Sequence, residues 1–281
     1  MDFEASEVNE AALEEERIFV VAKDNVALEK KFFDEAWRDF EPYEVTEASF
    51  MGKDKGLIEI PGIEHLVGKK ILICSCGSGI EPTVVAKQGG QVFAFDISYV
   101  ACLNAKKMAT YNGVAVSNNV SDINYLSYFD DTFDLIYGCS ILHHIDCALA
   151  GKELHRVLKP GGRAFFLENS DRNPILRFFR RSCFGEPDEH QKTKFLFFER
   201  LGSSEEYPLT ECEVEILAAS FDGNIYRSNK YFCFFYLLDY LIFRKGWVGE
   251  LLWSVDKTIG RMFPFLKKYS FFQEILLIKS Q

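Results

Sequence analysis

From Lys70 to residue 168 the sequence alternates short apolar runs with stretches of helical pattern. The apolar runs are continuous, as in Ile71–Ile73, Val92–Phe95 and Ala164–Leu167, which is typical of strands buried on both faces of a sheet. Alternation of this kind indicates βαβ units, because a helical crossover joins neighbouring parallel strands. We predict strands at 70–75, 91–96, 115–120, 133–138 and 163–168, and helices near 82–88, 98–112 and 147–158.

The sequence is less regular after residue 168. Thr210 and Glu213 form a capping-box pattern that predicts a helix to about residue 220. A weak strand pattern follows at 223–228, and another strand is expected at 272–279. The predicted fold is therefore α/β, with a Rossmann-like, mainly parallel seven-stranded sheet and helices on both faces. Two insertions interrupt it, at about 169–208 and 231–268.

The formal net charge of −10 lies at the start of the chain. Residues 1–60 carry the acidic excess, on amphipathic helical patterns at 9–26 and 27–40, before Pro and Gly residues break the pattern. We predict an N-terminal helical extension or cap over 1–62 and a catalytic domain over 63–281. The acidic excess argues against a nucleic-acid partner, since phosphate binding needs a basic surface. Alternatively, it is only a solvated helix face.

The eight cysteines are scattered, and no two pairs have zinc-ligand spacing, so we expect no metal site. The N-terminus lacks the apolar core of a secretory signal, and no apolar run reaches about 18 residues, which a spanning helix needs. We therefore expect a cytoplasmic protein without a transmembrane segment. The aromatic stretch at 231–243 leaves four alternatives open: the roof of an acceptor pocket, a homodimer contact, a peripheral contact with a lipid surface, and core packing of the insertion.

A glycine-rich loop follows the first predicted strand. Gly77 and Gly79 let the backbone bend tightly and approach a ligand closely. The second strand ends at Asp96, nineteen residues after Gly77, where a carboxylate can bind the two hydroxyls of a ribose. Asp122 follows the third strand, where an acid can accept from a purine amine. Together these positions predict a nucleotide crevice at the carboxyl edge of the sheet.

Over about residues 65–170 the chain resembles the class I S-adenosylmethionine (SAM)-dependent methyltransferases, in particular the small-molecule branch akin to ubiquinone-biosynthesis enzymes. The similar motifs are the glycine-rich segment 71–79, the ribose-binding segment 95–98, the acid and fourth strand in 121–136, and the turn at 155–162. NAD-binding Rossmann proteins normally have G-x-G-x-x-G, whereas Pro82 occupies the third glycine position here.

The resemblance implies SAM as the cofactor, with S-adenosylhomocysteine as the product. The cofactor-binding residues it implies are Cys74, Ser75, Cys76, Gly77, Gly79, Glu81, Asp96, Ile97, Ser98, Asp122, Ile123 and Cys139. The sequence departs from the family's pattern at two positions. Ile73 stands where the family has an acid that orients the methionine part of SAM, and Ser75 stands where it has a glycine. Either Glu81 substitutes for that acid, or backbone groups and a water suffice.

By the same resemblance, the segment after the fourth strand lies beside the transferred methyl group. His143 and His144 are our catalytic candidates, because imidazole can take a proton from a hydroxyl near neutral pH. The alternative is that both histidines only shape a structural turn. Methyl transfer is a direct displacement, so positioning in a dry pocket can suffice without a base.

Residues 172–194 are basic and contain interleaved phenylalanines. One interpretation is a lid that holds an anionic acceptor. The other is a helix face that pairs with the acidic N-terminal helices.

The function we expect is methyl transfer from SAM to a small molecule. The first choice of acceptor is a hydroxyl on a natural product or sugar-like compound. The alternatives are N- or C-methylation, a lipid or quinone-precursor acceptor, and a non-catalytic SAM-binding regulatory module.

Overall fold

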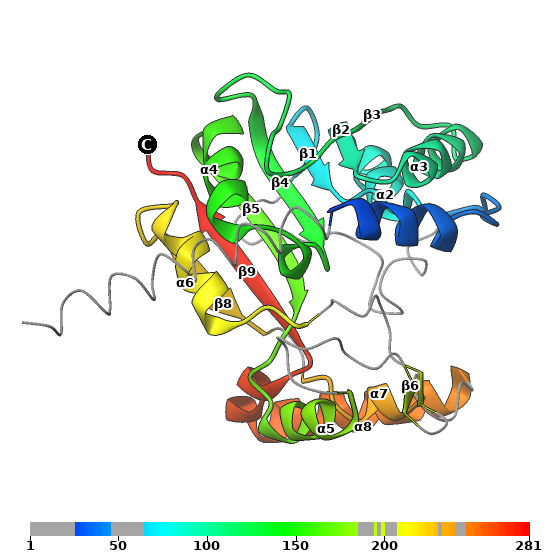
Figure 1. Cartoon of the computed structure of the whole chain (residues 1–281), viewed down its shortest axis with the longest axis vertical. Coiled ribbons are helices and arrows are strands. Elements are labelled where there is room, and N and C mark those ends of the chain that lie inside the picture. Colours follow the sequence, from blue (N-terminus) through cyan, green and yellow to red (C-terminus); the bar gives the residue numbers. More distant parts are fainter. Residues whose placement is uncertain are drawn as a thin grey trace, which may run out of the picture.

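The computed structural model describes residues 26–45, 65–184, 194–195, 198–199, 207–229, 232–239 and 246–281. At its centre is a seven-stranded sheet made of β1 (Lys70–Cys74), β2 (Gln91–Asp96), β3 (Val116–Val120), β4 (Phe133–Cys139), β5 (Leu158–Asn169), β8 (Ile225–Ser228) and β9 (Phe272–Ile278). The strands lie in the order β3-β2-β1-β4-β5-β9-β8 (Figure 1).

Parallel pairing joins the first five strands. Ile71 of β1 lies opposite Val92 of β2 on one side and Leu135 of β4 on the other. Among the described strands of this sheet, β9 makes the antiparallel pairings, with β5 and with β8. The predicted α/β fold with a mainly parallel seven-stranded sheet is confirmed.

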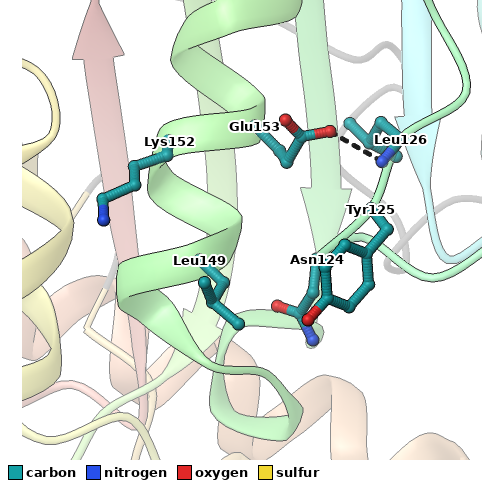
Figure 2. Close-up of a pocket in the computed structure, with 6 residues that line it drawn as sticks. All are labelled: Asn124, Tyr125, Leu126, Leu149, Lys152 and Glu153. Atoms are coloured by element: carbon teal, nitrogen blue, oxygen red, sulfur yellow. Dashed lines mark hydrogen bonds between the residues drawn. The ribbon is translucent and has the colours of Figure 1, made fainter.

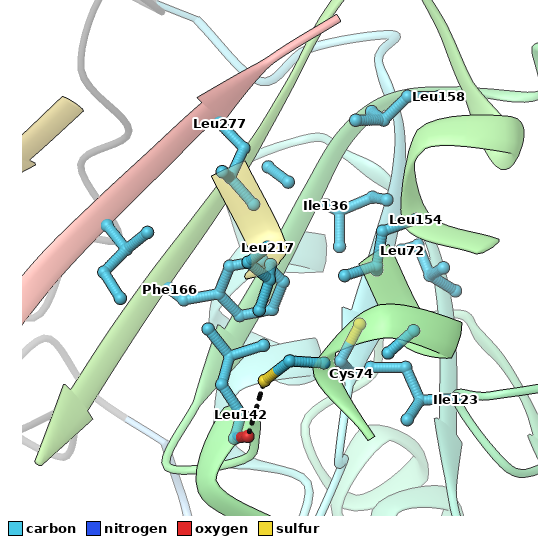
Figure 3. Close-up of a cluster of buried hydrophobic side chains, with 14 of the residues drawn as sticks. Leu72, Cys74, Ile123, Ile136, Leu142, Leu154, Leu158, Phe166, Leu217 and Leu277 are labelled. Carbon is cyan, nitrogen blue, oxygen red and sulfur yellow. Dashed lines mark hydrogen bonds between the residues drawn. The ribbon is translucent and has the colours of Figure 1, made fainter. Parts of the chain in front are cut away.

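Helices cover both faces of the sheet. They are α2 (Ile80–Lys87), α3 (Tyr99–Tyr111), α4 (Cys147–Val157) and α6 (Glu211–Ala219). Side chains alternate between faces along each strand: Leu72 packs in a buried cluster with Leu154 of α4 and Leu217 of α6 (Figure 3), whereas Ile73 packs in a second cluster with Met108 of α3. These two apolar cores hold the carboxyl ends of the strands in place.

Local signals set several helix starts. Ser98 caps α3 by accepting from Ala101 N–H, and Asp146 caps α4. Thr210 and Glu213 form the predicted capping box of α6. Helix α2 begins two residues before the predicted position, because Gly79 takes the left-handed conformation at the N-cap. Pro82 still lies in the first turn, where its missing N–H costs nothing.

The insertions contain more regular structure than the sequence indicated. The first holds α5 (Pro174–Phe184) and a two-stranded sheet of β6 (Lys194–Phe195) and β7 (Phe198–Glu199). The second holds α7 (Tyr236–Leu238), the 17-residue helix α8 (Gly246–Met262) and the 3-10 helix η4 (Pro264–Tyr269). In Figure 1, α5, α7 and α8 lie at one end of the molecule, beyond the carboxyl end of β5.

Two predictions lie partly or wholly outside the described residues. Of the N-terminal helical patterns, 26–36 is helical, and residues 9–25 are outside the described part. The predicted domain boundary at 62 falls in the stretch 46–64, which is also outside it. Among the described helices, none combines the length and apolar character needed to cross a membrane.

Candidate functional site

The glycine-rich loop between β1 and α2 has three residues with positive φ. They are Ser75 (60°), Gly77 (46°) and Gly79 (87°). A Cβ at position 79 would lie 2.5 Å from the Cα of Ala105, so the loop and α3 pack backbone to backbone. Only glycine fits there, on both conformational and steric grounds. This packing holds the loop in place at the carboxyl end of β1.

Asp96, at the end of β2, binds this loop directly. Gly77 N–H donates to its Oδ2 at 3.0 Å and Ser98 N–H donates to its Oδ1 at 2.9 Å. The hydroxyl of Ser75 also donates to Oδ2, at 3.4 Å. Burial raises the pKa of Asp96, and these hydrogen bonds act in the opposite direction. Asp96 therefore sets the shape of the loop as well as offering a carboxylate at the crevice.

The other predicted cofactor residues fall into two groups. Glu81 and Asp122 contribute carboxyl groups: burial raises the pKa of Glu81, and Asp122 accepts from Asn124 N–H at 2.8 Å. The side chains of Cys74, Ile123 and Cys76 are buried in the apolar cores, as is Ile73, and the partly buried Cys139 packs against one of them. Ile97 is partly buried, and the Ser98 side chain caps α3. Because these side chains are buried or partly buried, Cys74, Cys76 and Cys139 are expected to meet a cofactor only through backbone groups.

His143 lies in the short 3-10 helix η2 (Leu142–His144) after β4, and it pairs with a residue that sequence reasoning missed. Its Nδ1 is 2.8 Å from Oε2 of Glu168, a fully buried residue near the end of β5. The other carboxylate oxygen of Glu168 accepts from Ile141 N–H at 2.7 Å and Leu142 N–H at 2.8 Å. The signal in the sequence was an acid within an otherwise apolar strand end.

A carboxylate accepts hydrogen bonds, so the His143–Glu168 contact places the proton of the neutral ring on Nδ1. Nε2 is then the free acceptor of His143. The ring of His144 lies against that of His143, with centroids 4.2 Å apart. Nδ1 of His144 is 2.9 Å from Oε1 of Glu29, and its ring meets Phe33 edge to face. Both histidines are almost fully buried.

The N-terminal segment 29–45 contacts each part of this edge. Asp34 Oδ1 accepts from the Ser98 hydroxyl at 2.6 Å. The ring of Trp37 lies over Gly77, 3.4 Å from where a Cβ would stand, and its carbonyl accepts from Asn104 of α3 at 2.7 Å. Burial, and after it the charge of Glu81, raise the pKa of the Tyr43 phenol. The sequence does not predict the hydrogen bonds of Asp34 and Trp37, because their partners are 64 and 67 positions away.

Three arginines of the first insertion, Arg172, Arg177 and Arg180, have acidic partners within the C-terminal half of the chain. Arg180 binds Asp171 at 3.0 Å, and Arg172 binds Glu211 at 2.9 Å. These described ion pairs differ from the predicted pairing with the N-terminal helices. Asp171 and Arg172 both follow β5, so these pairs connect α5 and the start of α6 to the chain just after β5.

A hollow of about 400 Å³ lies between the segment after Asp122 and helix α4 (Figure 2). Its lining is Asn124, Tyr125, Leu126, Leu149, Lys152 and Glu153, none of which was predicted as a site residue. Among the described residues, no three His, Cys, Asp or Glu side chains gather as a metal site requires.

Comparison with known proteins places the similarity on this core. Residues 72–166 match the family model described as a methyltransferase domain. The ubiquinone biosynthesis O-methyltransferase of Pseudomonas aeruginosa (strain LESB58) is 32% identical over 116 residues, 41% of this chain and 50% of that enzyme. The Azotobacter vinelandii enzyme of the same name is 33% identical over 115 residues, 40% and 49%. The chain thus spans about half the length of the relatives it matches.

A solved structure supports the fold. Haemonchus contortus phosphoethanolamine N-methyltransferase 2, in complex with phosphomonomethylethanolamine and S-adenosylhomocysteine, superposes with a TM-score of 0.50. The sequences are 15% identical, and the match covers 78% of this chain and 50% of that one.

Proposed function

We propose that the protein transfers a methyl group from SAM to a hydroxyl of a small molecule, since residues 72–166 match the methyltransferase domain model and resemble methyltransferases in sequence. In this proposal residues 63–281 form the catalytic domain and residues 1–62 form its cap. The observation that carries the catalytic part is the His143–Glu168 pair, which lies at the same edge of the sheet as the glycine-rich loop and Asp96.

The residues at this edge fit SAM by their chemistry. SAM presents hydrogen-bond donors in its ribose hydroxyls, its adenine amine and its methionine ammonium group. Asp96, Asp122 and Glu81 supply carboxyl acceptors, and the left-handed glycines let the loop approach closely. We assign the ribose to Asp96, the adenine amine to the Asp122–Ile123 segment and the ammonium group to Glu81. Glu81 then replaces the acid that the family carries where Ile73 is buried in this chain.

When bound, SAM would supply an electrophilic methyl group: the bond from the acceptor oxygen to the methyl carbon would form as the carbon–sulfur bond breaks, and S-adenosylhomocysteine would leave. The chain's own part is to hold the acceptor and to remove its proton. Glu168 fixes Nδ1 as the protonated nitrogen of His143, so Nε2 takes the proton as the oxygen attacks. His144 packs against the ring of His143, and Glu29 and Phe33 in turn contact His144, so this group keeps water away from the pair.

A hydroxyl on a natural product or sugar-like compound remains our first choice of acceptor, because proton removal by His143 serves an oxygen nucleophile. The second candidate is a lipid or quinone-precursor hydroxyl, which the names of the P. aeruginosa and A. vinelandii relatives favour. A SAM-binding module without catalysis is the third candidate. It would bind cofactor with His143 and Glu168 performing no chemistry.

The test is a screen of acceptor classes with detection of released S-adenosylhomocysteine. The proposal expects turnover with a hydroxyl compound and loss of that turnover in His143→Ala. Cofactor binding without turnover on any class tested, and with no effect of His143→Ala, would support the binding module instead.

A further inference from the structure

Helix α5 turns its apolar side outward. Ile175 and Phe178 lie one turn apart on its exposed side, and the Phe178 side chain is 74% exposed. The inward side carries Arg180, bound to Asp171, and the buried Cys183. A surface helix of a globular protein normally has the opposite arrangement, with the apolar stripe against the core.

Helix α8 has the same inverted arrangement. Trp247, Leu251 and Val255 recur every four residues and form an exposed stripe, with Trp247 70% exposed. The inward side is fixed by other contacts. Asp256 accepts the N–H groups of residues 234, 235 and 236, and a Cβ on Gly249 would lie 2.5 Å from the Asp239 carboxylate. The helix therefore cannot rotate to bury the stripe.

The two helices belong to one end of the molecule. Asn173, which precedes α5, donates from Nδ2 to the carbonyl of Tyr269 in η4 at 2.7 Å. Helix η4 follows α8 directly and exposes Phe265. Figure 1 shows α5 and α8 at this end, beyond the carboxyl end of β5. We call Ile175, Phe178, Trp247, Leu251, Val255 and Phe265 the apolar surface.

The charge of this end opposes that of the whole chain. Helices α5, α8 and η4 carry seven Lys and Arg residues and two acids, and Asp171, just before α5, pairs with Arg177 and Arg180. One of the acids, Asp256, is buried in backbone contacts. The whole chain has a net charge of −10. A basic, aromatic surface on an acidic protein is complementary to an apolar layer beneath anionic headgroups.

We propose that the apolar surface docks on an anionic phospholipid bilayer. Trp247 and Phe178 enter the boundary between headgroups and acyl chains, and exposed basic residues such as Arg261 and Lys268 contact the phosphates. This proposal is independent of methyl transfer, since it concerns a surface outside the His143–Glu168 pair. Docking would bring the carboxyl edge of the sheet close to acceptors dissolved in the membrane.

The test is co-sedimentation of the full chain with vesicles, without cofactor. One vesicle set is phosphatidylcholine alone, and the other is an equal mixture of phosphatidylcholine and phosphatidylglycerol. We expect at least tenfold more protein on the anionic vesicles and a loss of binding as salt screens the charges. Trp247→Ser with Phe178→Ser should weaken this binding about tenfold. The matched control is Phe129→Ser, which removes a 90% exposed phenylalanine before β4 and should change nothing.

Absence of binding to anionic vesicles overturns the proposal, as does binding that the double variant retains in full. Thermal unfolding of each variant shows that it is folded, so lost binding is assigned to the surface. Analytical ultracentrifugation tests the other occupant of the apolar surface, which is a second copy of this chain. A dimer that the double variant separates, in a chain that binds no vesicles, would make the apolar surface an interface between copies and overturn the proposal. A failed methyl-transfer assay leaves all these results standing.

Discussion

Oε2 of Glu168 lies 2.8 Å from Nδ1 of His143, while its Oε1 accepts the backbone N–H groups of Ile141 and Leu142. One buried carboxylate thus shapes the turn after β4 and orients the ring that the turn carries. The parallel register of β4 and β5 brings the two residues together, since Ser140 N–H donates to the Leu167 carbonyl at 2.8 Å. A similar carboxylate–imidazole pair orients the base in many hydrolases.

Glu168→Gln tests the role of this carboxylate. An amide has a single oxygen, so it cannot accept both from the Ile141 and Leu142 N–H groups and from Nδ1 of His143, and the ring loses its fixed tautomer. The kcat should therefore fall at least about 100-fold. The Kd for SAM should change little, because Glu168 is a positioning residue for the base. Steady-state kinetics across pH would show the acid limb of kcat altered in Glu168→Gln and absent in His143→Ala.

Glu213→Gln is the matched control, because glutamine preserves a capping box and this acid is in α6. An unaltered pH profile and kcat in Glu168→Gln would contradict a base oriented by Glu168. A loss that is only structural would instead lower the urea midpoint and leave the profile of the folded fraction unchanged.

Asp96→Asn should weaken SAM binding at least about tenfold, because an amide cannot accept from both the Gly77 and Ser98 N–H groups and a ribose. Only the ionised carboxylate accepts them all. Burial raises the pKa of Asp96 above its ordinary value of 3.8, so affinity should begin to fall at a higher pH than for an exposed aspartate. Titration calorimetry at several pH values measures both effects.

Asp131→Asn is the control for Asp96. It removes an exposed acid that pairs with Lys279 at 2.7 Å, at the opposite end of β4, and it keeps a residue type that tolerates the left-handed backbone there. Equal affinity of both variants for SAM would mean that Asp96 is not a cofactor ligand.

Gly79→Ala and Gly113→Ala form a second matched pair. Both glycines have positive φ, but a Cβ at 113 meets nothing within 4 Å, whereas a Cβ at 79 lies 2.5 Å from Ala105. Gly113→Ala should cost about 1 kcal/mol of unfolding free energy, from backbone conformation alone. Gly79→Ala should cost about 3 kcal/mol, because overpacking adds to it. Urea unfolding measures both losses of unfolding free energy. Equal losses would contradict the close packing of Gly79 against Ala105.

Glu211 should make stability depend on acid pH. Hydrogen bonds from Arg172 and Arg227 lower its pKa from 4.5 to about 2. A lowered pKa stabilises the fold above the unfolded pKa, and that contribution is lost as pH falls from about 4.5 towards 2. Glu211→Gln should therefore flatten the decline of unfolding free energy across this window. Glu215→Gln, an exposed acid of the same helix, should leave the decline unchanged in urea titrations at each pH.

Local patterns carried the prediction of the sheet. Continuous apolar runs indicated β1, β2 and β5, and the remaining strands of the sheet were also predicted within a few residues; β5 differs in that it already begins at Leu158, where the chain pairs with Phe133 before the glycine turn. Helix α8 was not predicted, because its stripe faces outward and its inward side is Gly249, Asp256 and Gly260. That is the reverse of the pattern that indicates a surface helix.

The site was predictable only where its residues belong to a motif. The loop and Asp96 were found by spacing, but Glu168, Glu29 and Trp37 meet the motif residues only through tertiary packing. Glu29 is 115 residues from His144 in sequence. The local pattern of apolar residues does not predict a contact over such a distance in sequence.

If this chain binds SAM at the loop held by Asp96, titration calorimetry of the full chain with S-adenosylhomocysteine should show it. We expect saturable binding of one molecule per chain, weakened in Asp96→Asn and unchanged in Asp131→Asn. No heat of binding with either S-adenosylhomocysteine or SAM, from protein that unfolds cooperatively, would contradict it.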